Sequence, residues 1–224
     1  MSQLPSFDPQ QVPVVQVDSH LAAVPAHRLT AQALHARFAN PPVWQPELER
    51  ERKFMDRAPA HAAVLLGIVM REQPTVLLTQ RTAHMSTHSG QIAFAGGKCD
   101  PEDTDATATA LREAHEEVGL APAHVQVLGH LPTYITGSAF HVTPVVGLIS
   151  PDMQLRANPH EVDDVFEVPL AFLMNPAHHR WHRLELAGQT REWLSMPYQE
   201  PQQLRYVWGA TAGMLRNFYR FLSA

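Results

Sequence analysis

Residues 96–120, GGKCDPEDTDATATALREAHEEVGL, constrain the fold of this chain more than any other stretch. The stretch begins with a glycine pair, which allows close backbone approach, and its second half has the composition of a helix. That helix carries Glu113, Glu116 and Glu117 near its end. Each helical residue turns by about 100°, so Glu117 lies at about +40° and Glu116 at about −60° from Glu113. The three carboxylates therefore share one stripe of the predicted helix.

A second face of the same helix is suited to packing. It consists of Thr107, Leu111, Ala114 and Val118. We expect the helix to turn this face to a β-sheet and to keep its carboxylates on a separate side.

The position of the three carboxylates is unfavourable unless a cation or a basic group compensates their charge. Like charges three and four residues apart repel one another, and the C-terminus of a helix is the negative end of its dipole. A solvated acidic face is the simpler interpretation. Magnesium is the alternative, because it prefers carboxylate, carbonyl and water oxygens, and the upstream glycines can expose main-chain carbonyls. The stretch therefore favours a metal-binding helix.

Apolar and alternating runs on both sides of this helix predict an α+β or α/β domain, in which a mixed sheet carries helices on its faces. The predicted strands are 62–70, 75–81, 91–94, 125–132, 141–149, 180–186 and 191–198, with loops at 133–140 and 158–165. The other predicted helices are 28–38 with Thr30 as N-cap, a short helix after Pro46, a short piece at 168–175 and an amphipathic helix at 210–222.

The N-terminal part differs from the rest of the chain. Residues 1–26 are rich in Pro, Gln and Val without a sustained period, which predicts an extended or partly disordered lead-in. We therefore expect residues 1–58 to form an arm with short helices, and residues 59–224 to form the main domain.

Composition narrows the functional class. The 224 residues carry a formal net charge of −5, which argues against a partner that is a nucleic acid, because binding nucleic acid needs an excess of Lys and Arg. Cys99 is the single cysteine and allows no intrachain disulfide. The apolar run 62–70 is too short to span a bilayer, and the N-terminus lacks the features of a secretory signal. We expect a cytoplasmic protein that does not bind membranes.

The stretch 96–120 resembles the Nudix box, G-x5-E-x7-R-E-U-x-E-E-x-G-U, where U is a bulky aliphatic residue. Its second half, residues 112–120, follows this pattern with Ala114 at one aliphatic position. Its first half departs from the pattern. Counted from Gly97, the first box glutamate falls on Asp103, and eight residues instead of seven separate Asp103 from Arg112.

The resemblance extends to residues 77–120, which are similar to the coenzyme A pyrophosphatase branch of the Nudix hydrolases. That branch has the approximate pattern LLT-x-R-S-x-x-L-R-x-H-x-G-Q-V-x-F-P-G-G-K. This chain departs from it at Met85, Ser86 and Ala95. Roughly residues 60–222 are similar to the branch, which implies the Nudix fold, an α/β/α sandwich with a mixed β-sheet between helices.

The resemblance also implies roles for individual residues. It implies that Glu113, Glu116 and Glu117, with the Gly96 carbonyl, hold one to three Mg²⁺ or Mn²⁺ ions. It implies an orienting role for Arg112, and it leaves the general base open between Glu116, Glu117 and Glu161. The candidates for binding phosphate or the nucleotide end of a substrate are Arg81, His88, Gln91 and Lys98.

The implied activity is hydrolysis of a nucleotide diphosphate, with coenzyme A as the first expected substrate. A broader activity on ADP-ribose or dinucleotides is the alternative within the hydrolases, and a binding module of the same fold without turnover is the alternative outside them. Trp193, Tyr206 and Trp208 are expected in the core or in contacts of a homodimer, whose formation stays open.

Overall fold

The computed structural model describes residues 7–53, 57–82, 90–186 and 188–224. Its helices and 3-10 turns are η1 (Pro9–Gln11), η2 (Ala26–Arg28), α1 (Ala31–Ala39), α2 (Ala106–Val118), η3 (Pro122–His124), α3 (Leu170–Leu173), η4 (Pro176–His178) and α4 (Gly209–Ser223). Its strands are β1 (Val14–Val17), β2 (Ala60–Val69), β3 (Thr75–Arg81), β4 (Ile92–Ala93), β5 (Gly96–Lys98), β6 (Val125–His130), β7 (Tyr134–Ile135), β8 (Phe140–Ile149), β9 (Val162–Pro169), β10 (Arg180–Leu186), β11 (Gln189–Gln199) and β12 (Leu204–Trp208).

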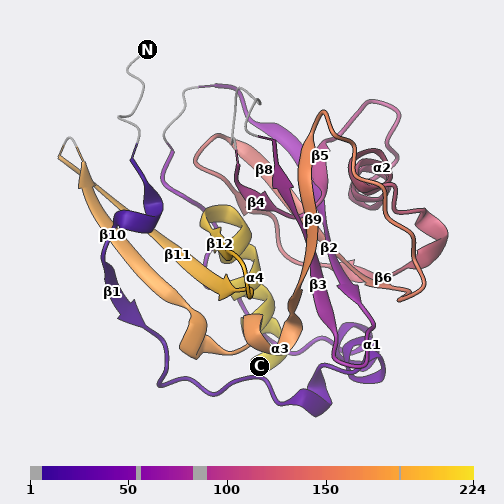
Figure 1. Ribbon diagram of the computed structural model, residues 1–224, viewed down its shortest axis with the longest axis horizontal. Helices are drawn as coiled ribbons and strands as arrows, with labels where there is room; N and C mark the ends of the chain where they lie inside the picture. Colours follow the sequence, from indigo (N-terminus) through magenta and orange to yellow (C-terminus); the bar gives the residue numbers. More distant parts are fainter. Residues whose placement is uncertain (1–6, 54–56, 83–89, 187) are drawn as a thin grey trace.

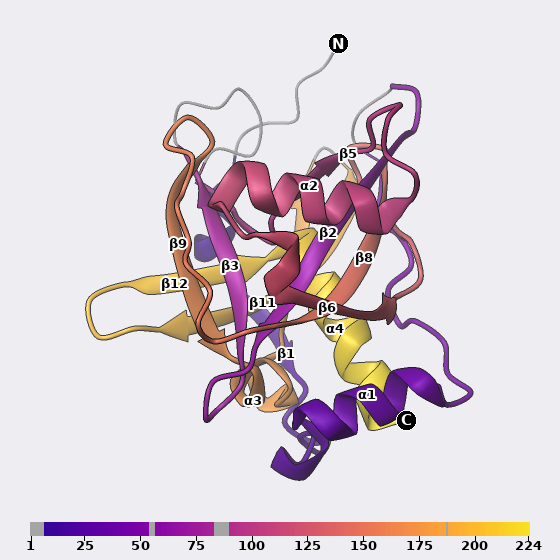
Figure 2. The ribbon, with the colours of Figure 1, turned by 90° about the vertical axis from the view of Figure 1, so that its right-hand side faces the viewer.

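The elements stack in layers (Figure 1). From left to right, these are a 4-stranded sheet in the order β1-β10-β11-β12, helix α4, an 8-stranded sheet and helix α2. Figure 2 shows α2 lying across the outer face of the larger sheet, in front of β2, β3 and β8. The predicted mixed sheet between helices is confirmed. The smaller sheet is an addition that covers the far side of α4.

The larger sheet opens at the end where the glycine pair lies. Strands β2 and β3 pair only at Ile68–Val76 and Val69–Thr75. Beyond these pairs the strands separate, and the segment 92–98 lies between them, because β4 pairs with β3 and β5 pairs with β2. Strand β2 runs parallel to β8 over its whole length. The glycine pair is thereby held inside the sheet instead of on a surface loop.

Each face of the larger sheet has its own apolar core. Leu66 and Leu78 pack with Phe218 of α4 on one face, whereas Leu65 packs with Ala110 and Ala114 of α2 on the other. Successive strand residues point to opposite faces, so the alternation along β2 serves both cores.

Most predicted strands are confirmed, with differences at their ends. Four short strands, β1, β5, β7 and β12, were not predicted, and β9 begins at Val162 within the loop expected at 158–165. Strands of two to five residues are too short to show a clear sequence period, and the alternation of β9 is interrupted where its pairing with β3 shifts register at Asp163.

Helix α1 is confirmed together with its cap, since the Thr30 side chain accepts a hydrogen bond from the Ala33 N–H. The short helix expected after Pro46 is absent from the described residues 46–53. There the Asn217 side chain accepts from the N–H groups of Glu47 and Leu48, each at 3.0 Å, and donates to the Leu48 carbonyl at 2.6 Å. A distant side chain thus provides the partners that helical hydrogen bonds would have supplied.

The helix predicted at 210–222 is present as α4, but it is buried on nearly all sides. Residues 211–219, 221 and 222 are all buried, because sheets cover the helix from both sides. None of the helices within the described ranges combines the length and the apolar character that crossing a bilayer requires.

Candidate active site

Helix α2 is defined by signals at both ends. The Asp105 side chain caps it by accepting from the Ala108 N–H at 2.8 Å. Gly119 ends it with φ of 69°, a left-handed conformation that favours glycine, and the N–H of Gly119 returns to the carbonyls of Ala114 and His115. The helix therefore stops two residues after Glu116, with its glutamates in the final two turns.

The glycine pair lets strand β5 approach α2 and β2 without side chains between them. A Cβ atom on Gly96 would lie 2.6 Å from the Val64 Cα, and one on Gly97 would overlap the Glu113 carboxylate. Neither position can hold a larger residue without movement of its surroundings. The pair therefore places main-chain atoms directly against the glutamate stripe.

The main-chain groups of Gly96 point away from β2. The Ala95 carbonyl accepts from Leu65, and the Cys99 N–H donates to His61, so the residues that bond to β2 are 95 and 99 in the alternating antiparallel pattern. The Gly96 N–H donates instead to Glu117 Oε2 at 3.2 Å. In a strand the carbonyl of the same residue lies on that side too, which keeps the Gly96 oxygen out of the β2 ladder.

Arg112 links two helix glutamates to the loop before the helix. Its Nη1 lies 3.0 Å from Glu113 Oε1 and 3.0 Å from Glu116 Oε2. Its other two nitrogens form a forked pair with Asp103, at 3.0 and 2.9 Å. This pairing holds the pKa of Asp103 well below its usual range, so Asp103 stays ionised.

Asp103 lies in a tight turn that it forms with Asp100. The Asp103 N–H donates to the Asp100 carbonyl, and the Asp100 N–H donates to Asp103 Oδ2 at 2.9 Å. The Thr109 hydroxyl adds a further bond to the Asp103 carboxylate at 2.9 Å. The shorter carboxylate therefore anchors Arg112 from a compact turn, a contact that the sequence did not predict.

The position of Glu117 differs from the prediction that the carboxylates of α2 lie on a separate side from its packing face. Only 2% of Glu117 is exposed, and it lies beside Ala110, Ala114 and Val118 on the buried side of α2. Thr107 and Leu111, which were expected to pack on the sheet, are only half-buried. The buried side of α2 is centred closer to Glu113 than the angular positions of the residues predicted. The open end of the sheet leaves room there for a carboxylate.

Burial changes the protonation of this carboxylate. It raises the pKa of Glu117 to about 7, and Arg81 and the Gly96 N–H partly oppose the effect. Burial also raises the pKa of Glu113, and the hydrogen bond from Arg112 opposes that rise.

Glu161 reaches the site because its loop is bonded to the end of α2. The N–H of Asn158 donates to the Glu117 carbonyl at 2.8 Å, and the Asn158 side chain donates to Glu161 Oε1 at 3.2 Å. The Glu161 carbonyl accepts from Thr82, next to Arg81. The charge of Glu161 contributes to raising the pKa of both Glu113 and Glu117, which places it near them.

The structure brings only some of the predicted substrate residues to the glutamates. Arg81 Nη1 lies 3.5 Å from Glu117 Oε1. Gln91 is half-buried and contacts Arg81 through its carbonyl, which accepts from the Arg81 N–H at 3.0 Å. Lys98 is exposed and pairs with Ala62, so its side chain leaves the sheet on the face opposite to Glu113. His88 lies outside the described residues.

Of the residues that depart from the branch pattern, one lies in the described part of the chain. Ala95 is buried in the core beneath α2, where its substitution concerns packing and not a substrate contact. Met85 and Ser86 lie outside the described residues.

The charges of the glutamates are balanced by arginine. Among the residues that the structure describes, no group of three His, Cys, Asp or Glu side chains converges in a way that could hold a metal ion. Glu113 and Glu116 turn to Arg112, and Glu117 turns to Arg81 and Gly96. Arg112 and Arg81 thus supply the basic groups that compensate the repulsion between the three glutamates.

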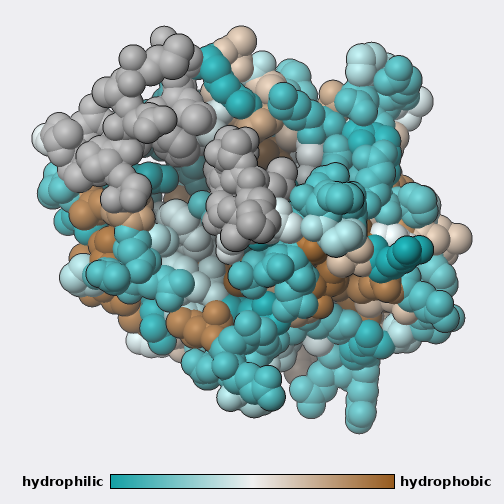
Figure 3. All heavy atoms as spheres, turned by 45° about the horizontal axis from the view of Figure 1, so that its top comes forward, coloured by the Kyte–Doolittle hydropathy of each residue, from teal (hydrophilic) through white to brown (hydrophobic). Residues whose placement is uncertain are grey.

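One positioning residue of this site, Asn158, was not predicted. Asn158 carries no chemistry of its own, and its role depends on the main chain of a distant helix. Three histidines close in sequence, His178, His179 and His182, and the aromatic residues Trp193 and Trp208 lie in or beside the smaller sheet, away from α2. In Figure 3, hydrophilic side chains predominate on the right-hand part of the face, where α2 lies.

Comparisons with known proteins agree with this arrangement. The NUDIX domain family model matches residues 59–201. A protein named uncharacterized Nudix hydrolase NudL from Escherichia coli O6:H1 is 47% identical over 159 residues, which cover 70% of this chain and 79% of that protein. The protein of the same name from Enterobacter sp. (strain 638) is 42% identical over 194 residues, which cover 85% of this chain and 94% of that protein.

Solved structures show weaker similarity. An Ap4A hydrolase from C. elegans aligns with 20% identity and a TM-score of 0.42, over 49% of this chain and 80% of that one. The family model spans more than half of the chain, and its span includes α2, the glycine pair and the Glu161 loop. The chain therefore belongs to the Nudix hydrolase family.

Proposed function

We propose that this chain hydrolyses the diphosphate bond of coenzyme A or its derivatives in the presence of Mg²⁺ or Mn²⁺, giving adenosine 3′,5′-bisphosphate and 4′-phosphopantetheine. The observation that carries the proposal is the contact between the Gly96–Gly97 backbone and the carboxylates of Glu113 and Glu117, with Arg81 beside them.

The chemistry of the donor set suits a hard divalent cation, although in this arrangement Glu113 and Glu116 are bonded to Arg112, and Glu117 to Arg81 and Gly96. Glu113, Glu116 and Glu117 offer carboxylate oxygens from one helix, and the Gly96 carbonyl lies on the same side of β5 as the N–H that bonds to Glu117. Magnesium and manganese prefer such oxygen ligands, and Nudix hydrolases generally use divalent metals. When bound, the cation would neutralise charge on the diphosphate and lower the pKa of a coordinated water.

The residues of the chain have separate roles in this proposal. Arg112 keeps Glu113 and Glu116 in place, since its fork is fixed by Asp103. Glu116, Glu117 or Glu161 accepts the proton of the attacking water. The water oxygen bonds to one phosphorus, the bridging P–O bond breaks, and the leaving phosphate oxygen keeps the bonding electrons.

The choice of coenzyme A comes from the similarity of residues 77–120 to the coenzyme A pyrophosphatase branch. A broader activity on ADP-ribose or dinucleotides is the second candidate. The departures from the branch pattern at Ser86 and Ala95 favour it. Ala95 is buried under α2, however, so it does not bear on a substrate contact, and Ser86 remains as the argument. A binding module without turnover is the third candidate, and the complete set of three helix glutamates disfavours it.

The test is an assay of a diphosphate panel that contains coenzyme A, ADP-ribose and a dinucleotide, with Mg²⁺ or Mn²⁺ and chromatography of the products. We expect fastest cleavage of coenzyme A, and we expect Glu116→Gln and Glu117→Gln each to lower kcat by at least about 10²-fold. His115→Gln is the matched control, because His115 is exposed on the same turn and should leave kcat unchanged.

Each other outcome rejects part of the proposal. Faster cleavage of ADP-ribose than of coenzyme A would reject the substrate but keep the hydrolase. Absence of turnover with every member of the panel, in folded protein with either metal, would reject the hydrolase and favour the binding module.

A further inference from the structure

Arg205 of β12 is a buried arginine that joins the two sheets. Only 4% of it is exposed. Its three nitrogens each have a partner: Nε lies 2.7 Å from Glu200, Nη1 donates to Gln80 at 3.1 Å, and Nη2 lies 2.5 Å from Asp164. Its guanidinium carbon also lies 3.8 Å from the centre of the Phe166 ring. Contacts on this scale fix the guanidinium in one orientation.

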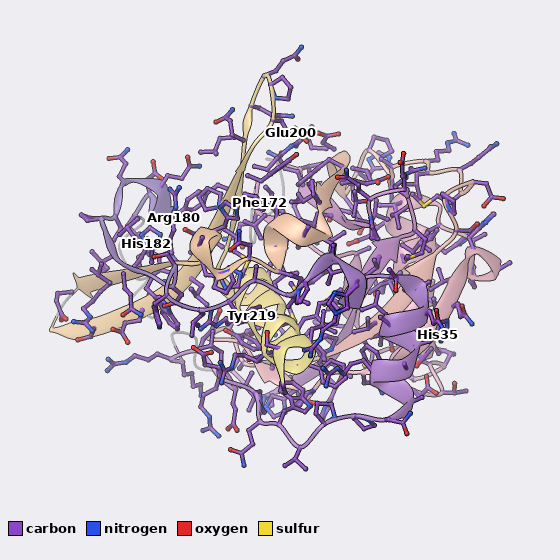
Figure 4. All side chains as sticks on the ribbon, turned by 90° about the horizontal axis from the view of Figure 1, so that it is seen from below. His35, Phe172, Arg180, His182, Glu200 and Tyr219 are labelled. Carbon is purple, nitrogen blue, oxygen red and sulfur yellow. The ribbon has the colours of Figure 1, made fainter. Side chains whose placement is uncertain are left out.

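The partners of Arg205 come from different parts of the fold. Glu200 follows β11 on the hairpin to β12, which projects from the body in Figure 4. Gln80 and Asp164 are opposite one another in the β3–β9 pairing of the larger sheet. Arg205 lies in the smaller sheet and therefore bonds across to a pair of residues in the larger sheet.

That residue pair borders an irregularity in the β3–β9 pairing. Gln80 pairs with Asp164, but the next residue, Arg81, pairs with Val162, so Asp163 has no opposite residue. Such a bulge shifts the side-chain alternation of one strand by one position. The bulge thus determines which face of the sheet the residues before Asp163 point to.

The packing of the side chains shows this shift. Phe166 packs in the core on the α4 side, whereas Val162 packs in the core on the α2 side, although regular alternation would put both on one face. Arg81, opposite Val162, reaches Glu117 of α2. Glu161 directly precedes Val162 and leads into the loop bonded to α2. Arg81 lies on the α2 side by the regular alternation of β3 from Leu77, and the bulge brings the end of β9, next to Glu161, to the same side.

We propose that Arg205 is a positioning residue for the hydrolysis: by clamping Gln80 and Asp164 on the α4 side of the sheet, it fixes the strand pair next to Arg81 and the bulge that leads into the Glu161 loop. The inference rests on the proposed function, since it concerns the geometry of the same site. Lysine cannot replace Arg205, because one ammonium group cannot bond to Glu200, Gln80 and Asp164 in a fixed plane.

The experiment compares Arg205→Lys and Arg205→Met with a matched control, Arg71→Met. Arg71 also binds a carboxylate of β9, Glu167 at 2.7 Å, but at the end of the strand far from Arg81. At a temperature where all variants are folded, we expect each Arg205 variant to lower kcat about tenfold or more and Arg71→Met to leave it within about twofold.

A double-mutant cycle with Arg81→Gln separates positioning from general destabilisation. If Arg205 acts through Arg81 and Glu161, the loss from Arg205→Met should largely disappear in the Arg81→Gln background. Additive losses would overturn the inference, because a merely structural role reduces kcat equally in both backgrounds.

A spectroscopic readout does not depend on turnover. In the ¹H–¹⁵N spectrum of Arg205→Met, we expect the largest amide shifts near the bulge, at residues 81, 82, 161 and 162, and smaller ones at residues 75–77. Shifts of equal size along β3 and β9 would overturn the inference. If the wild type hydrolyses no diphosphate, the proposed function fails; if it does and Arg205→Met has full kcat, only the role of Arg205 fails.

Discussion

At the scale of single residues, the site depends on the absence of a glycine side chain as much as on charged groups. Gly97 has no Cβ, and this space holds the Glu113 carboxylate. Arg112 then fixes that carboxylate from its other side at 3.0 Å. The position of Glu113 is therefore set by a steric fit and a charge-assisted hydrogen bond together.

This fit predicts the effect of a single methyl group. In Gly97→Ala the new Cβ displaces the Glu113 carboxylate, and a misplaced catalytic group of this kind lowers activity by about 10²-fold. Metal-dependent hydrolysis by folded protein measures the effect. Cys99→Ala is the control, since Cys99 is exposed two residues further on. Full activity of Gly97→Ala would show that Glu113 has no fixed place in the mechanism.

At the scale of elements, His179 lies where α3, β10 and α4 meet. Its Nε2 contacts the Leu173 carbonyl at 2.8 Å, and its Nδ1 faces Arg216 at 2.9 Å. Since Arg216 can only donate, Nδ1 must be the accepting nitrogen and Nε2 must carry the proton. The neutral ring is thus the form that joins these elements. Burial is the main reason that the pKa of His179 is lowered to about 4.

The lowered pKa predicts that acid weakens the fold. Between pH 6.5 and 4 the unfolded chain binds a proton at His179 that the folded chain does not, so stability falls as the pH decreases through this window. From pH 7.5 to 5 the loss amounts to about 2 kcal/mol. Nearby charges act in both directions, since Arg216 and His178 lower this pKa and Asp18 raises it.

Urea denaturation of the wild type and of His179→Gln over this pH range isolates the contribution of this histidine. The wild type should lose about 2 kcal/mol more than the variant between pH 7.5 and 5. Parallel pH profiles for the two proteins would contradict a buried neutral His179.

At the scale of the whole molecule, the N-terminal arm and the C-terminal helix form one ionic network. Arg216 of α4 lies 3.1 Å from Asp18 and 2.9 Å from Glu47, and both Arg216 and Asp18 are almost fully buried. Leu34 of α1 belongs to the same core as Phe218 of α4. Residues 18–47 are thus packed on the domain. The division at residue 58 stays a prediction.

This network predicts a large difference between two neighbouring arginines. Arg216→Met leaves the buried Asp18 carboxylate without its guanidinium and should lower the free energy of unfolding by about 3–5 kcal/mol. Arg220 also approaches Glu47, at 3.5 Å, but its side chain is 45% exposed, so Arg220→Met should cost less than about 1 kcal/mol. Chemical denaturation measures both. Equal losses would show that burial does not determine the strength of this network.

The sequence by itself determined most of the elements and the chemistry of one helix. The runs at 75–81 and 180–186 coincide with β3 and β10, and Thr30 caps α1, because strand alternation and helix capping involve residues close in sequence. The glycine pair and the three glutamates likewise carry a local spacing that indicated the family.

Tertiary structure alone decided where these groups lie relative to one another. It buried Glu117 on the packing side of α2, paired Arg112 with Asp103, and enclosed α4 between two sheets. It also placed Arg205 behind the β3–β9 bulge. The physical reason is that burial and ion pairing depend on residues distant along the chain, and no local period of the sequence records which of them meet.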